Sequence, residues 1–260
     1  MATNANGDPG RDRIRLLTRA DDAGMAESAN DAILACFEEG ILRNVSVMAP
    51  TPVLEHAADR LAGVDGLCVG AHVTLSSEWE DPTWGPVLGA DEVPSLVTEE
   101  GRFYRSPEAL FETDPDREEV LAEVTAQIER LRDVGFDPDY ADTHMLIEPA
   151  SEWFAEAFDD LCDREDLINW WGVPPLPGTE GIGSGPEWLL EQLDGVDPGT
   201  YLVVGHPAYD DEEMAEIWLP GGEPGTIASE RDAQRRMFTD ERVLEYVEQA
   251  GVEPIRYDEL

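Results

Sequence analysis

Apolar residues along the chain gather into short runs that alternate with longer amphipathic stretches. Short apolar runs at residues 14–19, 44–49 and 67–75 predict buried strands, and helical spacing of apolar residues over 26–39 and 52–61 predicts helices between them. Strands that alternate with helices in this way are typical of parallel β-α-β units. The first third of the chain therefore predicts an α/β fold built on a parallel sheet.

The same alternation returns in the second half of the chain. A strongly amphipathic helix is predicted at 115–134, and further elements follow it: strands at 140–144, 167–171, 201–205 and 253–257, and helices at 152–161, 188–193 and 230–250. No glycine-rich phosphate turn follows the first strand, which favours a barrel over an open nucleotide-binding sheet. We expect an irregular, TIM-like (β/α) barrel forming one domain over 14–260, preceded by a flexible acidic segment at 1–13.

A long segment at 76–105 interrupts the alternation. It shows no sustained periodicity and contains Trp79 and Trp84 together with several prolines and glycines. Loops of this length inside a compact domain are usually functional or disordered. The aromatic content favours a loop that covers a substrate.

The net charge of the chain indicates the conditions under which the protein works. The chain has 17 basic and 58 acidic residues, a net charge of −41, and every basic residue is an arginine. Such self-repulsion is screened in molar salt, where the Debye length is about 3 Å, and this predicts a halophilic cytoplasm. An intrinsically disordered acidic chain is the alternative, but the seven tryptophans and the apolar runs argue against it. Nucleic acids and anionic membranes are unsuitable partners because no basic patch is present.

The three cysteines and the amino terminus give further expectations. Cys36, Cys68 and Cys162 lack the close spacing of a metal knuckle or a redox pair, so we expect reduced core residues. Residues 1–13 lack the apolar stretch of a secretory signal, and no run reaches the roughly 20 apolar residues of a membrane span. These features predict a cytoplasmic protein; its assembly stays open, with a homodimer as one option.

Three of the four histidines stand at the carboxyl ends of predicted strands. They are His72, His144 and His206, whereas His56 falls within a predicted helix and is expected to be a surface or packing residue. A single histidine is more often structural than functional. Because sites form at the carboxyl edge of parallel sheets, three histidines at that edge favour a functional site.

The pair Asp21-Asp22 ends the first predicted strand and joins this set. Two adjacent acids among 58 mean little by themselves, so position carries the argument. Two imidazoles and one carboxylate form a common ligand set for a catalytic divalent ion, while the neighbouring carboxylate remains available as a base. Such an ion polarises carbonyls and lowers the pKa of water, which is hydrolysis chemistry. A Gly-x-Ser-x-Gly nucleophile motif is absent from the sequence, which disfavours covalent catalysis by serine.

At these same residues the sequence resembles the YdjC/ChbG-like (ChbG/HpnK) family of carbohydrate deacetylases. The resemblance rests on ordered motifs: Ala-Asp-Asp-Ala-Gly at 20–24 for the family's Ala-Asp-Asp-Phe-Gly, Gly-Ile-Leu-Arg-Asn-Val-Ser-Val-Met at 40–48, Gly-Ala-His-Val-Thr-Leu at 70–75, Asp-Thr-His at 142–144 for Asp-Ser-His, and Gly-His-Pro at 205–207. Each motif is short, but their order and spacing together are specific.

The resemblance implies a role for each of the five residues. Asp22, His72 and His144 would bind a divalent metal ion, Asp21 would be the general base, and His206 a general acid or a stabiliser of the transition state. It also implies an irregular (β/α) barrel and removal of an acetyl group from an N-acetylated amino sugar or oligosaccharide. The family association leans towards Mg²⁺, while the donor set of two histidines and one aspartate also suits Zn²⁺.

Two departures from the family pattern keep alternatives open. Ala23 replaces the family's phenylalanine, and residues 144–148 read His-Met-Leu-Ile-Glu where many members have His-x-His-x-His. The three-ligand set stays intact, but we expect altered sugar contacts, which leaves specificity for chitooligosaccharides open. The alternatives are a metal-dependent hydrolase of another amide or ester, and a sugar-binding protein with a degraded site, using one or more of four tryptophans: Trp79, Trp84, Trp170 and Trp171.

Overall fold

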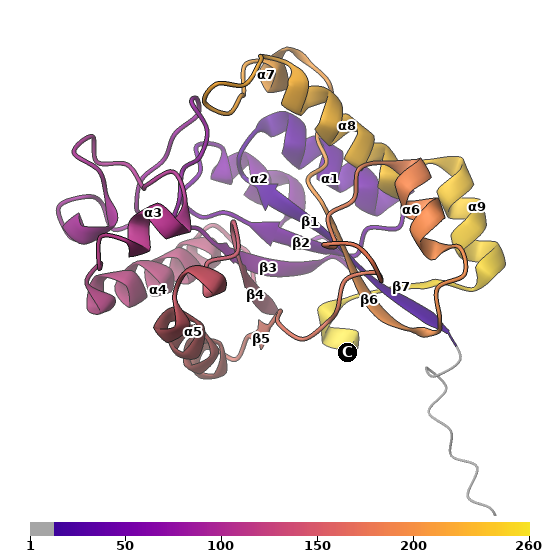
Figure 1. Ribbon diagram of the computed structural model, residues 1–260, viewed down its shortest axis with the longest axis horizontal. Helices are drawn as coiled ribbons and strands as arrows, with labels where there is room; N and C mark the ends of the chain where they lie inside the picture. Colours follow the sequence, from indigo (N-terminus) through magenta and orange to yellow (C-terminus); the bar gives the residue numbers. More distant parts are fainter. Residues whose placement is uncertain (1–12) are drawn as a thin grey trace, which may run out of the picture.

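A twisted, all-parallel sheet forms the centre of the structure, a computed structural model that describes residues 13–260 (Figure 1). The segment expected at 1–13 therefore lies, up to residue 12, outside the described residues. The strands are β1 (Ile14–Ala23), β2 (Asn44–Val47), β3 (Cys68–Val73), β4 (Tyr140–Thr143), β5 (Ile168–Asn169), β6 (Gly199–Gly205) and β7 (Glu253–Ile255).

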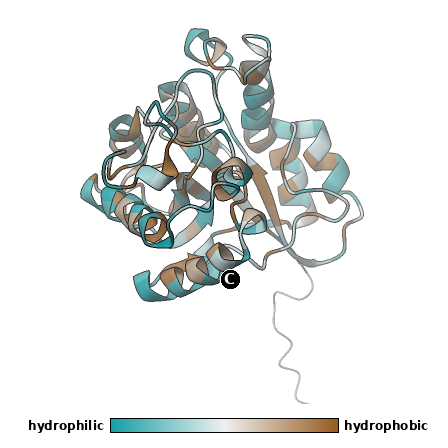
Figure 2. Cartoon of the chain, turned by 60° about the vertical axis from the view of Figure 1, so that its left-hand side comes forward, coloured by the Kyte–Doolittle hydropathy of each residue, from teal (hydrophilic) through white to brown (hydrophobic). Residues whose placement is uncertain are grey.

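Helices surround the sheet, as Figure 1 shows. They are α1 (Glu27–Glu39), α2 (Leu54–Leu61), α3 (Pro107–Phe111), α4 (Arg117–Asp133), α5 (Glu152–Glu165), α6 (Pro186–Leu193), α7 (Glu212–Ala215), α8 (Thr226–Thr239) and α9 (Glu241–Ala250), with short 3₁₀ helices at Pro94–Leu96, Glu148–Ala150 and Tyr257–Glu259. Figure 2 shows apolar colour on the strands and polar colour on the outer helix faces. The apolar periodicity thus reflects burial of one helix face against the sheet.

The strands run in the order β5-β4-β3-β2-β1-β6, and β7 also pairs with β1. The ten-residue strand β1 is central: one edge pairs with β6, and the other is shared by β7 near its start and β2 near its end. The buried Asn44 joins these partners, since its Nδ2 donates to the carbonyls of Thr18, at 2.8 Å, and Ile255, at 2.9 Å. The Asn44 side chain thus fixes the position at which the pairing partner of β1 changes from β7 to β2.

The expected irregular, TIM-like (β/α) barrel is present only in part, because the sheet is open and not closed into a ring. β5 has only two residues, and within residues 13–260 it does not pair with β6. The outer edge of β6 instead binds an irregular segment at 174–183: Leu202 N donates to Pro174 O and Val204 N to Gly181 O, each at 2.8 Å. This segment is rich in proline, which has no amide hydrogen, and in glycine, so it cannot form a regular strand that closes the barrel.

The helix predicted at 230–250 is two helices, α8 and α9. The chain leaves the helical conformation at Asp240 (φ −63°, ψ 130°), whose carboxylate accepts a hydrogen bond from Arg242 N at 2.9 Å and caps α9. Apolar periodicity continues across the break, which is why the pattern suggested one helix. The short helices α3 and α7 were not predicted, because four or five residues are too few to show a period.

The segment at 76–105 is irregular apart from one 3₁₀ turn, but its tryptophans pack inward. Trp79 and Trp84 are each 4% exposed, and the indole Nε1 of Trp84 donates to Ser76 O at 2.7 Å. Glu123 of α4 is fully buried and accepts hydrogen bonds from the amides of Val87 and Leu88. The loop is therefore fastened to α4, and Trp84 cannot stack on a sugar.

The expectation for the cysteines is confirmed: Cys36, Cys68 and Cys162 are free and buried. Burial raises the pKa of the Cys68 and Cys162 thiols to about 12, so both are protonated at neutral pH. Among residues 13–260, no helix combines the length and the apolar character needed to cross a bilayer.

Candidate metal centre

Four parallel strands bring the predicted site residues to one cavity. Asp21 and Asp22 lie near the end of β1, His72 lies in β3, and His144 and His206 directly follow β4 and β6. All five line the same cavity of about 500 Å³. Because the strands are parallel, their carboxyl ends meet at one edge of the sheet, and the side chains converge there.

Asp22, His72 and His144 form a buried group around a single carboxylate oxygen. Oδ1 of Asp22 lies 3.2 Å from Nδ1 of His144 and 3.6 Å from Nε2 of His72, and the three side chains are each at most 6% exposed. Their donor atoms lie within 4.8 Å of one another, as ligands of one ion would. Oδ1 has no hydrogen-bond partner among the residues of the described part. A buried carboxylate oxygen without a partner is costly, and a divalent cation would satisfy it.

The backbone at Asp22 is held in an unusual conformation. Its φ is 65°, in the left-handed region that few residues other than glycine adopt, and Gly24 follows with φ 99°. The amide of Gly24 donates to Oδ1 of the buried Asn30 at 2.8 Å, and a Cβ on Gly24 would lie 2.5 Å from Oγ1 of Thr51. The turn after Asp22 is thus fixed by Asn30 and requires glycine, which explains two residues of the motif.

Each imidazole of the group is oriented by a second carboxylate. Nδ1 of His72 donates to Oδ2 of Asp142 and Nε2 of His144 donates to Oε2 of Glu78, both at 3.0 Å. These bonds leave Nε2 of His72 and Nδ1 of His144 facing Asp22. A carboxylate behind a histidine fixes its tautomer and raises its basicity as a metal ligand.

Electrostatics at the two imidazoles favour positive charge. Burial alone would lower the pKa of His72, but Asp142 and Asp21 raise it to about 9. Burial opposes protonation of His144 as well, and Glu78 and Asp22 raise its pKa to about 10. The surrounding carboxylates therefore stabilise positive charge here, and a bound cation would replace the protons.

Asp21 points into the same cavity but is bound to an arginine. Its two carboxylate oxygens accept hydrogen bonds from Nε and Nη2 of Arg19, at 2.7 and 2.8 Å. Burial would raise the pKa of Asp21, but Arg19 and the nearby imidazoles together outweigh burial and lower it. Arg19 also lies 3.1 Å from Oδ2 of Asp142. In a second possible ligand combination, Asp21 with His72 and Asp142, both carboxylates thus already share a guanidinium as their charged partner.

His206 also lines the cavity and is held by Gln234 of α8. Oε1 of Gln234 accepts from the His206 backbone amide and lies 3.1 Å from its Nδ1, so Nδ1 carries the hydrogen of the neutral ring. Burial and the nearby Arg231 lower the pKa of His206, although Asp22 opposes this. At neutral pH the ring is therefore uncharged and Nε2 is its available acceptor.

The family model described as YdjC-like protein matches residues 15–182, well over half of the chain and including four of these five residues. The chain belongs to the YdjC-like family.

Relatives and a solved structure agree with this assignment. A carbohydrate deacetylase of Listeria monocytogenes serotype 4a is 30% identical to this YdjC-like protein, over 95% of the chain and 100% of the relative. A carbohydrate deacetylase of Thermoanaerobacter pseudethanolicus is 26% identical, covering 89% and 93%. A crystal structure described as a cellobiose-phosphate cleavage protein from Enterococcus faecalis V583 has the same fold, with a TM-score of 0.77, 21% identity, and coverage of 95% and 98%.

Four further residues of the YdjC-like site were not singled out in the sequence. Asp142 is part of the Asp-Thr-His motif, but the sequence analysis gave it no role. The pairing of β3 with β4 could have indicated one, because Asp142 lies directly beside His72 in the sheet. Arg19 precedes Asp21 by two positions on β1, so the two share one face of the strand. Arg231 lies on the buried face of α8, where a charged residue is conspicuous. Glu78 lies in the irregular loop, where no pattern reveals it.

The residues directly after His144 occupy the positions where many family members have further histidines. Met145 and Leu146 adopt left-handed conformations, with φ 59° and 54°, and are 41% and 50% exposed. Both line the cavity, together with the exposed Ile182 and Leu219. The outer wall of the cavity is therefore apolar, whereas its floor is charged.

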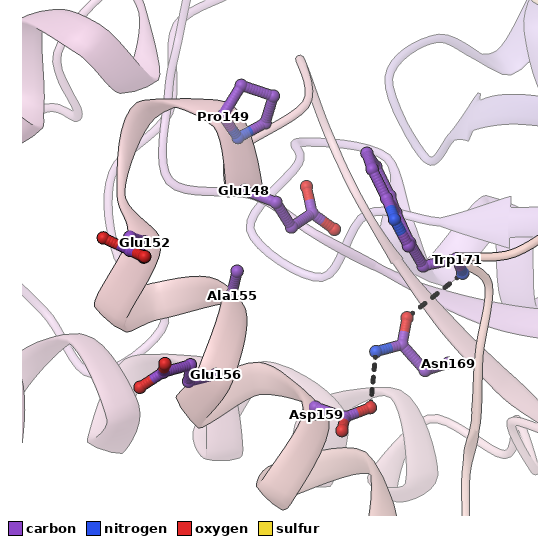
Figure 3. Close-up of a pocket in the computed structure, with 8 residues that line it drawn as sticks. All are labelled: Glu148, Pro149, Glu152, Ala155, Glu156, Asp159, Asn169 and Trp171. Atoms are coloured by element: carbon purple, nitrogen blue, oxygen red, sulfur yellow. Dashed lines mark hydrogen bonds between the residues drawn. The ribbon is translucent and has the colours of Figure 1, made fainter.

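A second cavity is lined by residues of α5 and of the 3₁₀ helix before it, together with Asn169 and Trp171 (Figure 3). Asn169 donates to Asp159 at 3.1 Å and accepts from the amide of Trp171 at 3.2 Å, so these polar groups are already paired. The carboxylates of Glu152 and Glu156 point away from Trp171 in Figure 3. This cavity contains none of the grouped metal ligands and is not the candidate centre.

Glu78 offers a specific test of the geometry around His144. In a Glu78→Gln variant the amide is a weaker and uncharged acceptor for His144 Nε2, so we expect the affinity for a divalent ion to fall roughly 10- to 100-fold. Calorimetric titration with Mg²⁺, Mn²⁺ or Zn²⁺ measures this. The matched control is Glu80→Gln, an exposed residue two positions further on that pairs with Arg105. Equal affinity in the two variants would contradict a role for Glu78.

Proposed function

We propose that this YdjC-like protein is a metal-dependent carbohydrate deacetylase, which hydrolyses the acetamide of an N-acetylated amino sugar or oligosaccharide. The observation that carries the proposal is the unpartnered Oδ1 of Asp22 between two oriented imidazoles, at the floor of a cavity large enough for a sugar unit. The carbohydrate deacetylases among its relatives support the substrate class. We assign the activity to the domain at 14–260.

We propose Asp22, His72 and His144 as the metal ligands. The donor set suits a divalent ion, with Mg²⁺ favoured by the family association and Zn²⁺ as the alternative. A bound ion supplies Lewis acidity toward an acyl carbonyl and toward water. Asp142 and Glu78 hold the two imidazoles in the tautomers that such an ion needs.

We propose Asp21 as the general base and His206 as the acid. Asp21 is ionised, because Arg19 lowers its pKa, and it accepts a proton from the attacking water. His206 can donate from Nε2 only after taking up a proton from solvent there, since its Nδ1 hydrogen is bonded to Gln234. It then delivers that proton to the departing nitrogen. The C–O bond to water forms, the C–N bond breaks, and the products are acetate and the amine.

Acetate release tests this function directly. The purified protein is depleted of metal, supplied with Mg²⁺ or Zn²⁺ in molar KCl, and incubated with N-acetylated mono- and oligosaccharides. The high salt offsets the repulsion of a net charge of −41. We expect acetate and free amine in equal amounts, dependent on the ion. Sugar binding without turnover under any of these ions would instead identify a binding protein.

A further inference from the structure

Arg231 enters the metal cavity from α8 and has no assigned role in the reaction. It is 7% exposed, and its Nη2 donates to Oδ2 of Asp22 at 2.7 Å. That bond uses the carboxylate oxygen that faces away from the imidazoles. The guanidinium carbon lies over the Trp79 ring, 5.3 Å from its centre, so the two groups make a cation–π contact.

Both members of this cation–π pair carry a buried hydrogen-bond donor without an acceptor. Within residues 13–260, Nη1 of Arg231 and Nε1 of Trp79 have no hydrogen-bond partner, and both residues line the cavity. Buried donors are nearly always paired in folded proteins. The chain has 58 acidic residues, yet no side chain of the described part accepts a hydrogen bond from either donor. This indicates that a ligand supplies the acceptor.

Other groups in the cavity do not supply such donors. Arg19 binds Asp21 through Nε and Nη2 and the Tyr257 hydroxyl through Nη1. Neutral His206 presents an acceptor at Nε2, and its protonated form is assigned above to the departing nitrogen. Arg231 and Trp79 are therefore the donors left for an oxygen atom of the substrate.

Building on the proposed deacetylase activity, we propose that Arg231 and Trp79 are catalytic residues that donate hydrogen bonds, from Nη1 and Nε1, to the acyl oxygen of the substrate. Arg231 is bonded to the metal-binding carboxylate, next to which the acyl group must react. This oxygen becomes negative in the tetrahedral state, so bonds from fixed buried donors strengthen as the reaction proceeds. The same donors would bind an oxygen of the acetate product.

Steady-state kinetics of Arg231→Gln and Trp79→Phe test the proposal. Phenylalanine keeps an aromatic ring but removes the N–H. Loss of one such donor is expected to lower kcat roughly 100- to 1000-fold with little change in KM. The control is Arg235→Gln on the same helix, which pairs with Asp232 outside the cavity. Wild-type turnover establishes the deacetylase separately, so its absence would reject the function rather than this assignment.

Two further measurements separate contact with substrate from an effect through Asp22. If Arg231 only positions Asp22, saturating metal restores the rate of Arg231→Gln, which would overturn the proposal for that residue. An N-thioacetyl substrate carries a weaker acceptor, so wild type should lose more rate from this exchange than either variant does. Equal losses in all three proteins would overturn the contact with the acyl oxygen.

Binding without turnover gives an independent readout. In ¹⁵N-indole spectra, the Trp79 resonance is identified by its loss in Trp79→Phe, and acetate should shift it in wild type. A resonance unmoved by saturating acetate would contradict the assignment of Trp79.

Discussion

The Asp22→Asn variant is expected to lose both metal binding and turnover. The change removes the charge from the carboxylate that, among residues 13–260, His72 and His144 share, and places an amide where Oδ1 or Oδ2 stood. Changing a residue behind a metal ligand typically costs 10- to 100-fold in affinity, so loss of the charged ligand itself should exceed about 100-fold. Titration calorimetry with Mg²⁺ and Zn²⁺, together with acetate release, measures the two losses.

The same substitution should also destabilise the fold. Arg231 Nη2 would face an amide instead of a carboxylate, and breaking a buried ion pair by removing one partner costs about 3–5 kcal/mol. Urea unfolding should show this reduction, whereas Asp65→Asn, at an exposed position, should match wild type in all three assays. Unchanged metal affinity in a folded Asp22→Asn protein would remove Asp22 from the ligand set.

The Asp21→Asn variant is expected to retain metal and lose catalysis. Asparagine has no carboxylate to take a proton from water, and general base catalysis typically contributes 10²- to 10⁴-fold, so kcat should fall by about that factor. Arg19 keeps Asp142 as a charged partner, which limits the disturbance of the buried network. The metal titration should therefore stay close to that of wild type.

The contrast between the two aspartate variants is the informative result. Metal-loaded Asp21→Asn with wild-type turnover would show that another group accepts the proton, and His206 Nε2 would be the next candidate. Loss of metal in both variants would mean that the adjacent carboxylates share one role. Acetate release at saturating metal distinguishes these outcomes.

The strand-end placement of Asp22, His72 and His144 could be predicted because parallel strands have a defined direction. Once three apolar runs were identified as strands, their polar ends had to meet at one edge. Glu78, by contrast, reaches His144 from an irregular loop whose course depends on the packing of Trp79 and Trp84. Tertiary contacts of this kind leave no periodic trace in a single sequence.

The errors in the predicted fold have equally local causes. The periodicity of apolar residues is not sensitive to a single capping residue, so the sequence did not predict the break between α8 and α9 at Asp240. Barrel closure depends on the last gap being bridged by hydrogen bonds, and the prolines after β5 remove donors there. The strand count alone could not reveal this, because an open and a closed sheet share the same alternation.

The irregular segment at 174–183 has a consequence for how the molecule behaves in a crowded solution. An open sheet exposes unpaired amide and carbonyl groups along its outermost strands, and these can recruit strands from other copies of a chain. Here the amides of Leu202 and Val204 are occupied by the segment itself, and the opposite strand, β5, is only two residues long. Both edges of the sheet are thus protected against pairing with strands of another copy, although the barrel is open.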